Sequence, residues 1–296
     1  MFLPSLLRAQ EFTYTTNNGN ITITKYIGPG GDVTIPDKID GLPVTSIGYF
    51  AFGIVYNVTN VTIPNSIVSI EADAFVVCKN LSSVVIPNSV TNIGFAAFSG
   101  CSSLTNFVFP NRLSKTGVAM LQYCTSLSNI TIPNNIVSIE GQTFLFCVNL
   151  TNVIIPASVT NLDSTAFGGC HSLKAIYFEG NAPPQGNPFP DTEPTIYYLP
   201  GTQNWDVTFD GRPTAQWYLP YPKILNLAPS FGVQTNVFGF IISWATNSSV
   251  VVENCTNLIN PSWLPVSTNL LADGASYFSD PGWANSSAQY YRVRVP

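Results

Sequence analysis

Apolar and polar positions recur with a fixed period of 23 residues through the middle of the chain. An apolar residue followed by proline marks one column, at Ile63, Ile86, Phe109, Ile132 and Ile155. A second column holds Phe52, Phe75, Phe98, Leu121, Phe144 and Phe167, and a third holds Cys78, Cys101, Cys124, Cys147 and Cys170. A leucine follows each of these cysteines by three positions. Because four columns share one period, the segment is predicted to consist of stacked structural repeats.

Each repeat contains one short segment with the alternation of a β-strand. Val84 and Ile86 alternate with Val85, and Pro87 then removes a backbone donor and ends the strand. One such coil cannot bury its own apolar edge, whereas stacked coils pair their strands in parallel at a spacing of about 4.8 Å. The predicted fold class is therefore mainly β: a solenoid of 23-residue coils, with one short parallel strand per coil.

The pattern changes on both sides of the repeats and predicts four regions. Residues 1–10 resemble the end of a secretion signal, because an apolar run leads to Ala9. Residues 11–179 are predicted to form the solenoid with N-terminal cap strands. Residues 180–227 break the period, are rich in Pro, Gly and aromatic residues, and are predicted to be a C-terminal cap or linker. Residues 228–296 contain alternating runs broken by turn residues, which predict a small antiparallel β-sandwich.

Composition excludes several classes of function. Charged residues are 9% of the chain, against about 25% in ordinary soluble domains. A net charge of −5 argues against a nucleic-acid partner, which requires clustered Lys and Arg. No apolar run approaches the roughly 18 residues that a membrane-spanning helix needs, so no membrane span is expected.

Residues with catalytic or metal-binding chemistry are few. Five of the six cysteines share one column, which gives poor disulfide geometry, so we expect buried thiols. The spacing of zinc ligands, such as two close C-x-x-C pairs, is missing. His171 is the sole histidine and occupies a variable position of the repeat, with no aligned acid or nucleophile. We therefore expect no catalytic residues, no metal and no cofactor.

Two surfaces are candidates for binding. The solvent-pointing column of the strands contains Thr62, Val85, Val108, Thr131, Ile154 and Tyr177. This nearly uncharged, partly apolar face suits contact with another protein, although strand propensity alone also explains β-branched residues there. In the cap, Trp205 and Trp217 lie near Glu179, Asp191, Glu193, Asp206 and Asp210 in the sequence. Aromatic rings beside acids could hold or cleave a glycan, and cap packing and turn formation explain the same residues.

The repeated block resembles a known family. Residues 84–104 read VVIPNSVTNIGFAAFSGCSSL, and this pattern, repeated over residues 33 to about 179, is similar to the BspA-type, or treponemal, leucine-rich repeat. The resemblance implies a curved solenoid exported to a bacterial or protist surface, which binds proteins or cells and carries no catalytic residues. One coil departs from the pattern: Thr116 and Leu121 replace Ile and Phe, and Arg112 and Lys115 occur together. We expect this coil to be looser than the others.

Together these features predict a non-enzymatic, secreted or cell-surface protein. The leading hypothesis is protein interaction or adhesion through the strand face, with extracellular or cell-surface proteins as partners. The alternative is a carbohydrate-binding or carbohydrate-processing accessory protein that uses the aromatic cap or the C-terminal module. A third hypothesis is a stiff spacer, since seven strand positions at about 4.8 Å give roughly 30 Å of stack.

Overall fold

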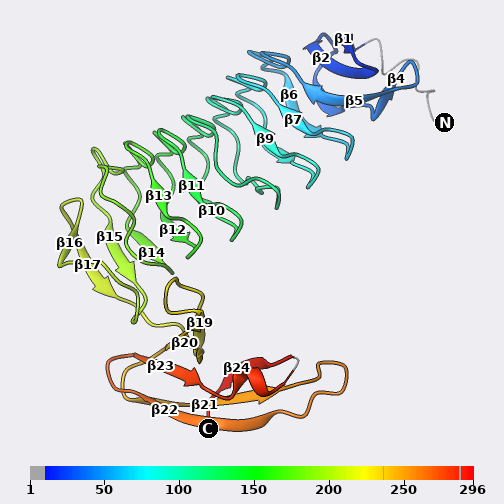
Figure 1. Ribbon diagram of the computed structural model, residues 1–296. Coiled ribbons are helices and arrows are strands. Elements are labelled where there is room, and N and C mark those ends of the chain that lie inside the picture. The colour runs from blue at the N-terminus through cyan, green and yellow to red at the C-terminus, as the bar shows by residue number, and fades with distance from the viewer. Residues whose placement is uncertain (1–10, 236, 287) are drawn as a thin grey trace. The chain divides into compact units, whose positions relative to one another are not determined.

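The computed structural model describes residues 11–235, 237–286 and 288–296 (Figure 1), so the expected signal remnant in residues 1–10 lies outside the described residues. The chain divides into two compact units. The first unit runs up to Ile176 and also includes Pro183–Thr195 and Asp210–Arg212. The second unit comprises Tyr177–Ala182, Ile196–Phe209 and Pro213–Pro296. Strands β14 (Ala175–Phe178), β15 (Thr195–Tyr198) and β17 (Arg212–Gln216) therefore contribute residues to both units.

Two hairpins begin the first unit. Strands β1 (Phe12–Asn17) and β2 (Asn20–Tyr26) pair antiparallel across Asn18 and Gly19, both of which have positive φ. This is the two-residue turn that Asn-Gly favours between strands. Strands β4 (Lys38–Ile39) and β5 (Leu42–Ile47) pair across Asp40 and Gly41 in the same way. β2 then pairs in parallel with β5, so these hairpins cover the first edge of the repeat stack.

The coils that follow contribute short strands to two parallel ladders, and Figure 1 shows these coils stacked one behind another. The first ladder contains β3 (Gly31–Thr34), β6 (Val58–Thr62), β8 (Ser83–Val85), β10 (Asn129–Thr131) and β12 (Asn152–Ile155). The second contains β5, β7 (Ser69–Ile70) and β9 (Asn92–Ile93), then β11 (Ser138–Ile139) and β13 (Asn161–Leu162). In residues 105–127 the strands are reduced to single bridges at Val108 and Lys115. The predicted fold class is confirmed, and this coil is the irregular one.

The phenylalanine column forms an aromatic stack inside the coils. The rings of Phe52, Phe75 and Phe98 stack with centroid distances of 4.7 and 5.0 Å, and all three side chains are fully buried. Leu121 interrupts the stack, and Phe107 from the same coil packs its edge against Phe98 at 5.3 Å. The missing ring is thus partly replaced from another column, which keeps the interior filled.

The cysteine column forms a second internal ladder, of thiol hydrogen bonds. Each thiol donates to the carbonyl oxygen 26 residues earlier, at sulfur–oxygen distances of 3.1–3.3 Å. The buried hydroxyl of Thr192 continues the series by donating to the Phe167 carbonyl at 3.1 Å. All six cysteines are free and buried, as the sequence predicted for the repeat cysteines. Burial raises the pKa of the Cys78 and Cys170 thiols to about 12.

The thiol ladder predicts a specific pattern of chemical reactivity. Because the thiolate is the nucleophile, buried thiols of raised pKa are expected to resist iodoacetamide at pH 8 in the folded protein. After unfolding in guanidinium without a reductant, all six cysteines should be alkylated. Mass spectrometry of the two samples checks this. Cysteines that stay unmodified after unfolding would reveal disulfides and contradict the thiol ladder.

The second unit contains a β-sandwich, made of two antiparallel sheets. One sheet contains β18 (Lys223–Leu225), β19 (Gly232–Gln234), β20 (Val237–Ser243) and β23 (Ala275–Asp280). The other contains β21 (Ser248–Cys255), β22 (Leu264–Leu271) and β24 (Tyr290–Arg294). A single 3-10 turn, η1 (Trp283–Asn285), is the only helical element within the described residues. The first strand, β18, precedes residue 228, where the sequence placed the start of the module.

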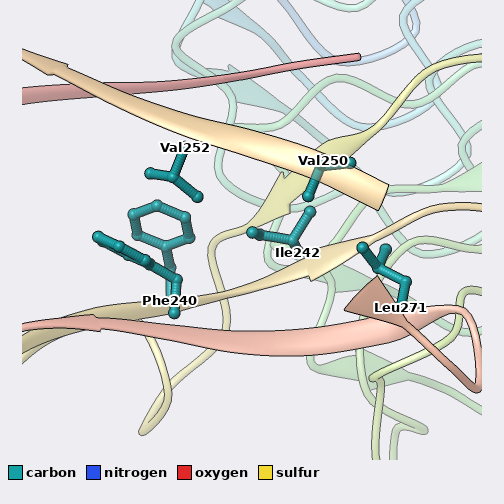
Figure 2. Packing of buried hydrophobic residues seen from close by; sticks show 6 residues of the cluster. Phe240, Ile242, Val250, Val252 and Leu271 are labelled. Atoms are coloured by element: carbon teal, nitrogen blue, oxygen red, sulfur yellow. The ribbon is translucent and has the colours of Figure 1, made fainter. Parts of the chain in front are cut away.

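Alternating residues of the two sheets fill the space between them (Figure 2). Phe240 and Ile242 come from β20, Val250 and Val252 from β21, and Leu271 from β22, and Phe278 of β23 completes this buried cluster. The alternation arises because successive side chains of a strand point to opposite faces. The neighbours of Val252 on β21, namely Val251 and Glu253, therefore lie on the outer face of their sheet.

Glu253 makes the sandwich sensitive to acid. Its carboxylate accepts hydrogen bonds from Arg294 at 2.7 Å and Arg292 at 2.8 Å, and these bonds lower the pKa of Glu253 below its ordinary value of 4.5. A lowered pKa in the folded state stabilises the fold above pH 4.5, and this stabilisation is lost as the pH falls through the folded-state pKa. The urea concentration at the unfolding midpoint is expected to fall between pH 7 and pH 3. This fall should be smaller in the variant Glu253→Gln than in the wild type. Glu193→Gln, whose side chain is 79% exposed, is the control and should keep the wild-type dependence.

Candidate protein-binding face and aromatic cluster

The first ladder of strands places five of the expected residues in one row. Thr62 pairs with Val85, Val85 with Val108, Val108 with Thr131, and Thr131 with Ile154, each one coil further along. We call Thr62, Val85, Val108, Thr131 and Ile154 the strand-face row. Val85, Val108 and Ile154 are 66%, 56% and 49% exposed. The residues on either side of them in the strands are buried because the strands alternate.

Two hydroxyl groups beside the strand-face row are hydrogen-bonded within the solenoid. The hydroxyl groups of Ser82 and Thr151 donate to the carbonyl oxygens of Thr59 and Ser128 in the preceding coil, at 3.1 and 3.4 Å. Strands β6, β8, β10 and β12 contain no charged residue. A partner that covers Val85, Val108 and Ile154 therefore displaces water from apolar side chains and from no charged one of these strands, which lowers the cost of desolvation.

The sixth residue, Tyr177, belongs to the second unit, where it forms an aromatic cluster. Its ring stacks on Tyr197 at 5.0 Å and lies 4.9 Å from Trp217. All three rings are half-buried, and Glu179, two positions after Tyr177, pairs with Lys223 at 2.7 Å. Sequence reasoning missed Tyr197, although the alternation of residues 195–198 could have placed it on the same face as Tyr177.

The two cap tryptophans do not share a surface. Trp205 stacks on Tyr198 at 5.2 Å and lies 4.9 Å from Phe178, whereas Trp217 contacts Tyr177. Tyr177 and Phe178 are consecutive residues of one strand, so they point to opposite faces. Trp205 and Trp217 thus lie on opposite faces of β14, and both are half-buried.

The other residues considered for chemistry are dispersed. Glu193 pairs with Arg212 at 3.2 Å, Glu179 pairs with Lys223, and a carboxylate oxygen of Asp210 lies 3.5 Å from the amide nitrogen of Gly186. Asp191, Asp206 and His171 are exposed. Among residues 11–235, 237–286 and 288–296, no group of three His, Cys, Asp or Glu side chains could hold a metal ion. Within the same ranges, no helix has the length and apolar character needed to cross a membrane.

Comparison with known proteins agrees with the repeat architecture. Residues 45–174 match six copies of the BspA type leucine rich repeat region. The leucine rich repeat protein of T. pallidum (TpLRR) shares 32% identity and a TM-score of 0.56 over 63% of this chain and 85% of that one. A leucine rich cell surface protein from Faecalibacterium prausnitzii shares 29% identity and a TM-score of 0.47, over 57% of this chain and 53% of that one. A search of curated proteins gives no significant match. The chain belongs to the BspA-type leucine-rich repeat family.

Proposed function

We propose that this chain is a non-enzymatic protein-interaction module of the bacterial cell exterior, which binds another protein through its strand-face row. The observation that carries the proposal is the row itself: exposed Val85, Val108 and Ile154, aligned from coil to coil by parallel backbone pairing, beside strands without charge. Protein interfaces have an apolar centre depleted of charged residues, and this face has that composition before any partner binds.

Rigidity favours the same function. The row is formed by backbone pairing from coil to coil, and the neighbouring hydroxyl groups are fixed to carbonyl oxygens. Little conformational entropy is therefore lost when a partner covers it. Family membership supports the proposal, because the BspA-type resemblance implies an exported solenoid that contacts other proteins or cells.

A screen of the full chain against purified extracellular and cell-surface proteins on an array tests the proposal. At least one protein is expected to bind reversibly, and its binding should be insensitive to moderate salt because the row carries no charge. Salt-sensitive hits would indicate surface charges elsewhere on the chain. An array without a salt-resistant protein hit would contradict the proposed function.

A further inference from the structure

A pocket of about 240 Å³ opens on the second ladder, at the irregular coil of residues 105–127. Its walls come from two neighbouring coils: residues 91–93 on one side and residues 113–118 on the other, with Glu140 of the next coil at the rim. This volume is below the roughly 300–1,000 Å³ of pockets that take drug-sized ligands. The pocket therefore has room for one small chemical group.

The pocket exists because coil-to-coil hydrogen bonds are missing at this place. In the regular coils the amide of Thr91 donates to the Val68 carbonyl at 3.0 Å, and that of Gly94 to the Ile70 carbonyl at 2.8 Å. Ser114 and Gly117 occupy the equivalent positions one coil later. Among the described residues, neither has a backbone hydrogen bond to the preceding coil.

Thr116 holds its part of the irregular coil against the following coil. It stands where neighbouring coils have isoleucine, and its hydroxyl oxygen accepts a hydrogen bond from the amide of Glu140 at 2.9 Å. The same hydroxyl lies 2.8 Å from that of Thr143, and the amide of Thr116 donates to the Ser138 carbonyl at 3.2 Å. These contacts tie Thr116 to the following coil. The gap behind it is a wedge that closes at Gly117, where the Ile93 and Gly94 carbonyl oxygens lie against the backbone.

The two walls of the wedge have complementary hydrogen-bonding groups. The amide of Ser114 is a donor on one wall, and the carbonyl oxygen of Thr91 is an acceptor on the other. At Gly117 the two coils touch, since a Cβ added there would lie 2.8 Å from the Ile93 carbonyl oxygen. At the rim, Lys115 and Glu140 contribute one positive and one negative charge. Such a site suits a neutral group that donates and accepts at once, as a sugar hydroxyl does.

An apolar lip borders the polar wedge. Val118 lines the pocket and is 40% exposed, and Phe95, one coil earlier in the same column, is 54% exposed. The amide of Ala96 donates to the Val118 carbonyl at 2.9 Å, so Phe95 and Val118 lie on adjoining coils. An aromatic ring beside a few polar groups is a common composition of small-molecule sites.

We propose that the wedge between residues 91–93 and 113–118 binds one neutral sugar residue of a glycan. The wedge lies on the second ladder, so this binding is independent of the strand-face row and of the protein partner proposed above. Hydroxyl groups of the sugar bridge the donor wall and the acceptor wall, and Phe95 covers one face of its ring.

Saturation-transfer difference NMR on the full chain tests this site, with mannose, galactose and N-acetylglucosamine added one at a time. At least one sugar is expected to show saturation transfer, with a Kd of about 1 mM, which corresponds to roughly −4 kcal/mol. Ser114→Trp, at an exposed position, fills the wedge and should weaken this binding at least tenfold. Val137→Trp, at the same position one coil later and 47% exposed, is the matched control and should bind normally.

A second pair of variants tests the aromatic lip. Phe95→Ala should weaken sugar binding several-fold, whereas Tyr49→Ala, which removes the exposed ring two coils earlier in the same column, should not. Circular dichroism of all four variants verifies that they fold. The proposal is overturned if none of the three sugars shows saturation transfer, or if Ser114→Trp binds as well as Val137→Trp. It is equally overturned if Ser114→Trp blocks only a protein partner, because the wedge then holds a protein side chain.

Discussion

Replacing Phe98 with Ala is expected to reduce the free energy of unfolding of the solenoid by about 3–5 kcal/mol, the usual range for a fully buried phenylalanine. Phe98 is 0% exposed, and its ring contacts Phe75 at 5.0 Å and Phe107 at 5.3 Å. The change removes a ring from the centre of the stack beside the irregular coil. The surrounding coils are held by backbone pairing and can collapse into the cavity only partly.

Phe95→Ala is the matched control for this prediction. Phe95 lies in the same coil as Phe98 but is 54% exposed, so its loss should change stability by no more than about 0.5 kcal/mol. Guanidinium unfolding followed by circular dichroism measures both variants. Each coil of a solenoid depends on its neighbours, so the whole unfolding transition of the Phe98→Ala variant should shift to a lower guanidinium concentration. Equal unfolding midpoints for the two variants would contradict the aromatic stack as the core of the repeats.

The second large effect is expected on binding, for the double variant Val85→Lys/Ile154→Lys. Both positions lie in the strand-face row and are 66% and 49% exposed, so the fold should tolerate the change. In the complex, two ammonium groups would have to lose their water in an apolar interface. Losing a single central contact costs about 2 kcal/mol or more. We therefore expect the affinity for the protein partner to fall by at least about 100-fold.

Val68→Lys/Val137→Lys provides the control for charge and spacing. These residues are 45% and 47% exposed, lie beside the second ladder, and are three coils apart, as Val85 and Ile154 are. This variant should bind the partner with the affinity of the wild type, within about threefold. Surface plasmon resonance with an immobilised array hit measures the three proteins. An equal loss of affinity in both variants would show that charge alone, and not the strand face, determines binding.

Much of the solenoid is predictable because its pattern of apolar and polar residues repeats. A 23-residue period places Phe75 against Phe98 and Cys101 above Cys78 without knowledge of any coordinate, since stacked coils must align equivalent positions. The alternation of strands likewise predicts that Val85 and Val108 point to solvent. Both expectations agree with the exposures in the structure.

Features that depend on departures from the repeat were only partly predictable. Thr116 marked an irregular coil in the sequence. The wedge, however, depends on which neighbouring coil the Thr116 hydroxyl contacts, and no sequence pattern predicts that contact.

The cap tryptophans are a similar case. Trp205 and Trp217 are close in sequence, yet they contact consecutive residues of β14. Trp205 contacts Phe178 and Trp217 contacts Tyr177, and these two side chains point to opposite faces. The turn residues of each coil were also missed: Val77 and Tyr123 adopt positive φ where Gly100 adopts it in the same column.

Hydroxyl-radical footprinting of the full chain, with and without a saturating protein partner, tests whether the partner covers the strand-face row. The method measures oxidation of individual side chains, and the exposed Val85, Val108 and Ile154 are reactive enough to report. We expect the partner to protect these three residues and to leave the oxidation of Val68 and Val137 unchanged. Protection confined to residues 223–296, or to Val68 and Val137, would contradict binding through the strand face.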